Sequence, residues 1–520
     1  MVAAVLNTLI VCGLSMVLAV PLGSLLAILI HRTDVCGRRL AWLAIGSQLA
    51  VPLYVVAGVW SAGLGWQGWI RWAVSSGPDW LRPWLAGPQP ATATGSGTWS
   101  AVSSAPVELA NLLAVCAIHA LAAIPGVCLI VSLGLASGHP RQEEMALSEG
   151  GTGQWLRFSL LPRLRIWLAA ACLWCAIPVL TEMVVTNLYQ VPTVAEQVYL
   201  DASRGGLSPW TYVAGVGVCM LPIIVVGAAI GRRSPAWSHV IASASVGQRQ
   251  PLRLRGARWL SSLAVWMLLA IIVGLPLLNV IIKAGWQPRL DAAGRASYGW
   301  ELSRLLTTAY ESLTLYTAEM RWSLALAVGS TTLALGAAAG LGLCARRPWH
   351  RNLIAAMALG MLAVPGPLVG MLVIFCMNRD WPSGLGFLYD STLAAPLLAQ
   401  QFRLFPLAWL LSQTIRASIP QRVREQALAD GLSGPSATWH IYLGMTWRLW
   451  AAAALVLAVV SIGELSCSIL VLPPGVTTLS MRLFEMLHFG MRHQDSGLCG
   501  LLIGLGWVVA LLSWKTLRER

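Results

Sequence analysis

Charge is scarce in this sequence, and lysine is almost missing. Of 520 residues only 11% are charged, against about 25% in an average soluble domain. Lys283 and Lys515 are the only lysines, and neither follows glycine, so the chain has no Gly-x4-Gly-Lys-Ser/Thr phosphate loop. It also has no His-Glu-x-x-His zinc motif and no Gly-x-Ser-x-Gly nucleophile elbow. We therefore expect no enzyme of these classes, no catalytic residues and no cofactor held by this chain.

Hydrophobic residues make up 57% of the chain, in stretches that are long enough to cross a bilayer. A membrane-spanning helix needs about 20 mostly apolar residues. Such stretches recur along the whole sequence, which excludes a soluble protein with a single anchor. The sequence predicts an all-α, polytopic membrane protein of about eleven spans, at 4–30, 41–62, 109–136, 166–188, 211–231, 259–283, 322–344, 353–377, 393–416, 449–472 and 497–514.

The formal net charge of +14 belongs to the loops between these spans. In a soluble protein such an excess would suggest nucleic acid, but the arginines here form no single basic face, and we expect no nucleic-acid partner. Arginine and lysine concentrate on the cytoplasmic side of membrane proteins. With the loop 31–40 in the cytoplasm, 23 of the 35 Lys and Arg residues fall on that side. This orientation predicts the N-terminus outside and the C-terminus inside.

The sequence repeats itself across two halves. Asn7 to Arg32 and Trp322 to Arg347 are both spans rich in small residues that end in a basic turn. The matching spans are six apart, an even number, which predicts parallel repeats that run the same way through the membrane, unlike the inverted repeats of many secondary transporters. We expect a first half at 1–231 with five spans, a basic cytoplasmic linker at 232–258, and a second half at 259–520 with six.

One short pattern occurs at matching places in the two halves. Glu144-Met-Ala-Leu-Ser-Glu-Gly150 aligns without a gap on Glu425-Gln-Ala-Leu-Ala-Asp-Gly431. The leading carboxylate suits the positive end of a helix dipole. Glycine then ends the helix because it adopts the left-handed conformation easily. We expect each short helix to be followed by a second one, which gives a first knob (144–162) and a second knob (425–443) on the cytoplasmic side, where a partner could dock.

The two knobs resemble the EAA loop of binding-protein-dependent ABC importer permeases, Glu-Ala-Ala-x3-Gly-x9-Ile-x-Leu-Pro. The second knob matches this pattern at Glu425, Ala427, Gly431, Ile441 and Leu443, with Gly444 where proline is usual. The first knob is one residue short before its Leu-Pro, and it matches at Glu144, Ala146, Gly150, Leu161 and Pro162. Met145 and Gln426 replace the middle alanine in the two copies.

The resemblance implies a permease subunit in the bacterial inner membrane, with two pseudo-symmetric repeats around a central translocation path. Two copies of a cytoplasmic ABC ATPase would bind the knobs and hydrolyse ATP, and an external substrate-binding protein would deliver the substrate. Asn7-Thr-Leu, Val51-Pro-Leu-Tyr54 and Leu472-Pro-Pro-Gly475 are similar to the ferric-iron and thiamine importer permeases. Ferric iron is thus the first expected substrate, and thiamine, polyamine, phosphonate or sulfate are the alternatives.

Halves of that family usually have six spans, so the resemblance also implies that the first family helix is missing from the first half, or that another apolar span is encoded before Met1. The rival class is a secondary transporter or channel. Such a protein would not need the knobs and would carry coupling charges in the middle of the membrane.

Few charged side chains fall inside the predicted spans. Glu182 and Glu464 lie at matching depths, and a charge there costs about 2.5–3.5 kcal/mol, so each should face the interior of the bundle. A place on the translocation path and a structural contact between helices remain equal alternatives. For Arg403 and His119 we favour helix–helix contacts. The segment 481–493 is rich in Met and His, and we interpret it as interfacial rather than metal-binding.

Overall fold

The computed structural model describes most of both halves. The described residues are 2–64, 69–70, 105–136, 145, 148, 151, 153–204, 215–217, 220–221, 224, 227, 255–290, 296–345, 347–379, 384–431, 438–489 and 493–518. Most of the predicted span 211–231, of the linker 232–258 and of the outer loop 63–108 lies outside them.

The described residues of the first half are helical. In chain order the helices are α1 (Val2–Arg32), α2 (Arg38–Leu49), α3 (Leu53–Leu64), α6 (Ala105–Ala136), the π-helical turn η1 (Trp155–Leu160), α8 (Leu161–Thr181), α9 (Val184–Leu188) and α10 (Val194–Ser203). Proline lies in the first turn of α8, where its missing N–H leaves no hydrogen bond unmade.

The second half is also helical apart from one hairpin. It begins with η2 (Arg255–Ala257), α13 (Arg258–Leu269), η3 (Ala270–Gly274) and α14 (Leu275–Gly285), followed by the antiparallel strands β1 (Trp286–Leu290) and β2 (Ala296–Trp300). The remaining helices are α15 (Leu302–Thr314), α16 (Thr317–Cys344), α17 (Pro348–Ala363), α18 (Gly366–Met377), α19 (Leu385–Ser391), α20 (Ala394–Ala417), α21 (Gln421–Ala429), η4 (Thr438–Gly444), α23 (Trp447–Ile462), α24 (Leu479–Phe489) and α25 (Gln494–Arg518).

Six helical segments within the described residues are long and apolar enough to cross a membrane, or eight if each of two bent helix pairs counts as one span. The protein is therefore a helical, multi-pass membrane protein by length and composition. The predicted count of eleven stays a prediction. Of the other predicted spans, 449–472 overlaps α23, which begins at Trp447, ends at Ile462 and has only 16 residues. The span at 393–416 matches α20, whose apolar face is interrupted by Gln400, Gln401 and Arg403.

Four of the predicted spans are broken rather than continuous. The span at 41–62 consists of α2 and α3, bent by 103° before Pro52 and Leu53, and the span at 353–377 consists of α17 and α18, bent by 105° at Pro365. Proline explains both bends, because it cannot donate a hydrogen bond and its ring clashes with the preceding turn. The other two breaks follow α8 at Glu182 and α23 at Gly463.

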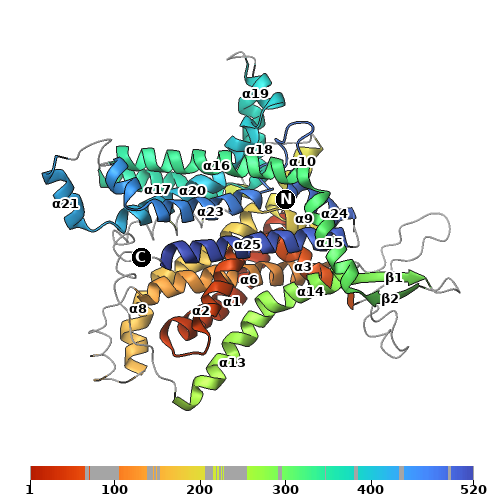
Figure 1. The fold of residues 1–520 in the computed structure, drawn as a ribbon, viewed down its shortest axis with the longest axis horizontal. Helices are drawn as coiled ribbons and strands as arrows, with labels where there is room; N and C mark the ends of the chain where they lie inside the picture. The colour runs from red at the N-terminus through yellow and green to blue at the C-terminus, as the bar shows by residue number, and fades with distance from the viewer. Residues whose placement is uncertain are drawn as a thin grey trace.

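The helices of the two halves interleave in one body. Figure 1 shows α16, α20 and α23 side by side, with α25 crossing between this group and α1 and α6. A buried cluster joins Tyr54 and Val59 of α3 to Leu483 of α24 and Leu498 of α25. A second cluster joins Leu180 of α8 to Ala363 of α17. Each half thus packs its bent helix pair against the other half.

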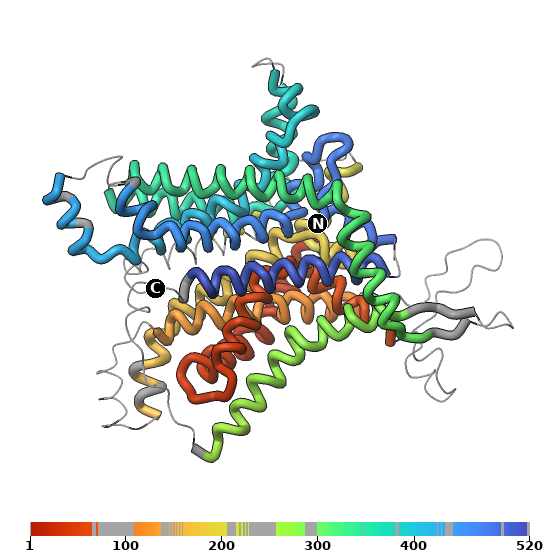
Figure 2. Tube along the Cα trace, viewed as in Figure 1, coloured from red at the N-terminus to blue at the C-terminus, as the bar shows by residue number. Residues whose placement is uncertain are grey.

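The two ends of the body differ in their projections. The tube in Figure 2 places α21, the beginning of α8 and the C-terminus at one end, and Figure 1 shows the hairpin β1–β2 extending from the opposite end. The predicted orientation assigns the first end to the cytoplasm and the hairpin to the outside.

Candidate functional site

The second knob has the short helix and the left-handed glycine that its sequence predicts, but α21 begins at Gln421, so the expectation that Glu425 lies in the first turn is wrong. Helix α21 projects from the body (Figure 1) and ends at Ala429. Gly431, two residues later, has a left-handed φ of +78°. Glu425 lies on the exposed side and accepts a hydrogen bond from Gln421 Nε2 at 2.7 Å. Ala427 and Ile441 are buried against each other in a small apolar cluster. The knob is thus an exposed polar helix on its own small core.

The first knob is described only in part. Glu144, Ala146 and Gly150 lie outside the described residues. The next residue, Gly151, has a left-handed φ of +66°. Leu161 is exposed and begins α8, with Pro162 after it, whereas the matching Leu443 is half-buried within η4.

A cavity of about 310 Å³ brings Glu182 and Glu464 to one place between the halves. The first half lines it with residues 49–54 around the α2–α3 bend and with the end of α8. The second half lines it with Arg403 and with the loop that follows α23. The sequence matched the two glutamates by depth, and the structure brings both to the same cavity. Most of the surrounding surface is apolar.

Each carboxylate binds the backbone just past the break in its own span. Glu182 has extended backbone after α8, its Oε1 accepts from Val184 N at 2.7 Å, and its Oε2 accepts from Val185 N at 3.2 Å. Glu464 Oε1 accepts from Cys467 N at 2.7 Å. Free N–H groups at the start of a helical turn need such acceptors. Both glutamates therefore stabilise the broken segment, and they do so at the wall of the cavity.

Arg403 makes the contact between helices that its sequence position favoured. Its guanidinium donates to the carbonyl oxygens of Leu362 at 3.0 Å and Val364 at 2.8 Å, which are left without partners where α17 ends before Pro365. A charged donor is well suited to these buried carbonyls, because hydrogen bonds to ionised groups are the stronger ones. Arg403 thus holds the α17–α18 bend that borders the cavity.

His119 lies in the comparable helix, α6, three residues before Ala122, which the ungapped alignment of Glu144 with Glu425 places at the position of Arg403. It is buried, and its Nδ1 lies 2.9 Å from Val115 O of its own helix. Among the described residues its Nε2 has no hydrogen-bond partner. Alanine stands at the position that matches Arg403 and has no side-chain donor, so it cannot cap carbonyl oxygens as Arg403 does.

Two pairs of hydroxyl contacts are the same in both halves, and sequence reasoning missed them. Thr8 of α1 accepts from Val194 N at 3.0 Å, and Ser323 of α16 accepts from Leu479 N at 2.8 Å. Thr193 and Thr478 then cap the helices that begin at these positions, α10 and α24. The sequence did offer a signal for these contacts, because each small-residue span has a hydroxyl side chain near its start, Thr8 in the first and Ser323 in the second.

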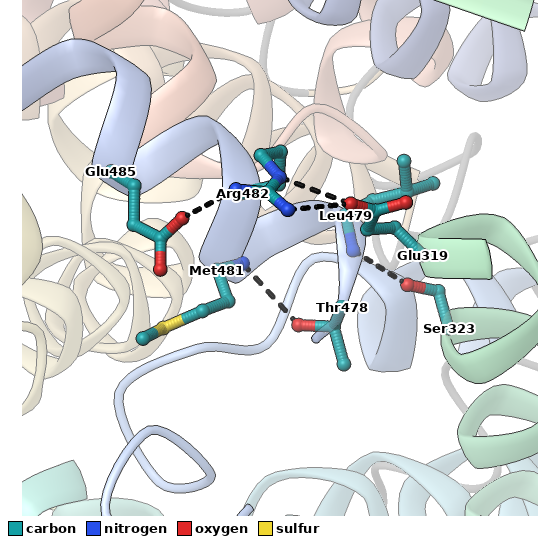
Figure 3. A network of polar contacts seen from close by, with 7 residues as sticks. All are labelled: Glu319, Ser323, Thr478, Leu479, Met481, Arg482 and Glu485. Carbon is teal, nitrogen blue, oxygen red and sulfur yellow. Dashed lines mark hydrogen bonds and ion pairs between the residues drawn. The ribbon is translucent and has the colours of Figure 1, made fainter. Parts of the chain in front are cut away.

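Two further charged contacts join helices of the second half. Arg482 of α24 donates to Glu319 of α16 at 2.9 and 3.0 Å and to Glu485 at 3.0 Å, as Figure 3 shows beside the Ser323–Leu479 bond. Lys283 and Asp495 form a buried ion pair, 2.7 Å long, between α14 and α25. None of these residues was a candidate, because the sequence does not bring together partners this far apart in the chain.

The segment rich in Met and His is built into the body. His488 Nε2 lies 2.9 Å from Asn187 Oδ1, and Met486 is buried in the cluster around α3. Among the described residues no group of three His, Cys, Asp or Glu side chains lies close enough to hold a metal ion. Comparison with known proteins yields no matching family and no matching curated sequence.

Proposed function

We propose that the chain is the permease subunit of an ATP-driven importer in the bacterial inner membrane. The observation that carries this proposal is the second knob: a projecting helix that is followed by a left-handed glycine and packs through Ala427 and Ile441. It lies at the end of the body that the arginine distribution assigns to the cytoplasm. A projection of this kind suits a docking partner that pushes on the membrane domain.

The proposed mechanism is alternating access by two parallel repeats. Two ATPase subunits close on ATP and displace the two knobs, and the halves then rock about the cavity that contains Glu182 and Glu464. The paired bends, the paired carboxylates and the paired hydroxyl contacts support a two-repeat architecture. An external binding protein delivers the substrate at the end that carries the hairpin. Ferric iron is the first substrate to test, and thiamine, polyamine, phosphonate and sulfate follow.

The test is reconstitution of the affinity-purified permease with its co-purifying proteins in lipid vesicles. We expect an ABC ATPase to co-purify, and substrate uptake to require both ATP and the loaded binding protein. Each candidate substrate is supplied with its binding protein in turn, and the arm that stimulates ATP hydrolysis names the substrate.

The two carboxylates at one cavity favour a second candidate, a secondary transporter driven by an ion gradient. In that case the permease alone takes up substrate when a proton or sodium gradient is imposed, and ATP adds nothing. Uptake by the lone chain would therefore refute the importer proposal.

A further inference from the structure

Arg416 joins three elements at the base of the second knob. It lies in the last turn of α20, and its Nη1 donates to the carbonyl oxygen of Gly342 in α16. Its guanidinium carbon lies 5.1 Å from the centre of the Tyr442 ring in η4. An arginine within about 6 Å of an aromatic face is attracted to the ring electrostatically. The Arg416 side chain thus links α20, to which it belongs, to α16 and to η4 of the second knob.

Tyr442 is itself held firmly. Its carbonyl oxygen accepts from Trp450 Nε1 of α23 at 3.0 Å and from the Thr446 hydroxyl. The preceding residue, Ile441, packs on Ala427 of α21. A displacement of α21 therefore reaches η4 through apolar packing, and it reaches α16 and α20 through the Tyr442–Arg416–Gly342 contacts.

The matching positions of the first half are apolar. Alignment of the two knobs places Leu135 at the position of Arg416 and Leu160 at that of Tyr442, and alignment of the two small-residue spans places Ala27 at that of Gly342. All three are buried in one apolar cluster. Apolar packing is non-directional, whereas a cation over a ring with a hydrogen bond to a carbonyl fixes one geometry. Leu135, Leu160 and Ala27 have neither a cationic nor an aromatic side chain, so their side chains cannot form this arrangement.

We propose that Arg416 is a positioning residue that couples the second knob to α16 and α20, so that a push on α21 by a partner protein moves both helices. The proposal rests on the importer function, because it presumes an ATPase at the knob. It adds that the contacts of Arg416 with Gly342 and Tyr442 contribute to coupling through the second knob.

The experiment measures ATP hydrolysed per substrate molecule imported, with the whole complex in vesicles. Arg416→Met keeps the length of the side chain and removes the charge and the donors. We expect near-normal ATP hydrolysis but a ratio of hydrolysis to import raised about tenfold, since a charged hydrogen bond is lost. Arg416→Lys should restore most of the coupling, because lysine keeps a donor and a cation. That rescue separates positioning from simple loss of fold.

Two further variants test the same contact from its other partners. Tyr442→Leu removes the ring and should behave like Arg416→Met, whereas Tyr442→Phe keeps the ring and should remain coupled. In Gly342→Ala the added Cβ would lie 3.3 Å from Arg416 Nη1, so a smaller rise in the ratio is expected. If Arg416→Met fails to fold, the Tyr442 and Gly342 variants still show whether this contact couples the second knob to α16 and α20.

The matched control is Arg379→Met. Arg379 also lies over a ring, 3.8 Å from the centre of Phe375, but its hydrogen bond within the described residues is to Phe375 O in the last turn of its own helix, α18. Its loss should leave the ratio unchanged. A normal ratio in both Arg416→Met and Tyr442→Leu, with the unaltered complex coupled, would overturn this inference alone. Failure of the unaltered chain to bind any ATPase would overturn the importer proposal itself.

Discussion

The two halves of the chain break their backbones at matching places but hold the breaks with different side chains. Pro52 and Pro365 begin bends of nearly equal angle, and Glu182 and Glu464 cap the turns after the next breaks. The first half surrounds these features mainly with apolar packing. The second half adds charged contacts that join helices far apart in the chain. The contacts that hold the backbone at the breaks are thus shared, whereas the side-chain contacts between helices differ.

This difference separates contacts that both halves share from contacts that occur in one half. Helix caps and prolines act on the backbone of neighbouring residues. The same local sequence in the two repeats therefore produces the same break in both. A charged contact between distant helices can be replaced by a well-packed apolar one at little loss of stability. We therefore interpret the paired bends and caps as the architecture that both halves share, and the charged contacts between helices as a feature added in the second half.

The largest effect is expected at the ion pair between α14 and α25. Lys283→Met leaves Asp495 as an unpaired charge, because the side chains are only 4% and 5% exposed. We expect the variant to lose about 3–5 kcal/mol of stability, measured by unfolding of the purified protein in detergent. The double variant Lys283→Met, Asp495→Leu should regain most of it, since no charge is left buried. An equal loss in the single and double variants would contradict this account of the pair.

The next comparison is Arg403 against His119. Arg403→Leu leaves the carbonyls of Leu362 and Val364 without a donor, and should cost about 1.5–3 kcal/mol in the same unfolding measurement. His119→Leu removes a side chain whose Nε2 has no partner, so its effect should be distinctly smaller. Equal losses from the two would show that the asymmetry between the bends has no energetic consequence.

The knobs come next, and their glycines allow a matched test. Gly431→Leu and Gly151→Leu each place a branched side chain on left-handed backbone, which costs about 1 kcal/mol or more. We expect each to insert normally and to lower substrate uptake, by about tenfold if the strain acts on the coupled state. Gly384→Leu creates the same strain before α19, with φ of +101° and no neighbour near the added Cβ, and should leave uptake unchanged. Equal loss in all three would point to general misfolding.

The smallest effect is expected at the two cavity glutamates. Gln keeps an acceptor for Val184 N and Cys467 N, so Glu182→Gln and Glu464→Gln should keep the broken turns. If the carboxylates act as caps, uptake falls by less than about threefold. Loss of uptake in both Gln variants, with normal stability, would instead assign the two negative charges to the substrate or to a coupling ion.

Much of the fold could be predicted from the sequence, because its signals are local. Apolar stretches located the helices, and the glycine pattern located the end of α21. The breaks were missed because a hydropathy window averages over them: residues 41–62 and 353–377 read as continuous, although Pro52 and Pro365 are visible in the sequence. Residues 449–472 were likewise read as continuous, although α23 ends just before Gly463. The packing of Gly463 against Pro52 of the other half, which leaves no room for a Cβ, could not be seen in the sequence.

The candidate site was predictable only where its residues repeat. Glu182 and Glu464 were found because their positions match in the two halves, and the cavity between them follows from the packing alone. Lys283–Asp495 and Arg416–Tyr442 have no local signature in the sequence. Their partners meet only after the helices have packed, so no pattern of spacing predicts them.

The central claim, that both knobs face the cytoplasm and contact an ATPase, has one direct test. Single cysteines at Ser148 and Asp430, in a variant without the native cysteines, are probed with an impermeant thiol reagent and with a thiol cross-linker. A third cysteine at Ala296, in β2, is the control for the outside. We expect positions 148 and 430 to react from the cytoplasmic side and to cross-link to the co-purified ATPase, and position 296 to react only from outside. Labelling of 148 and 430 from opposite sides, or of all three from one side, would contradict the account.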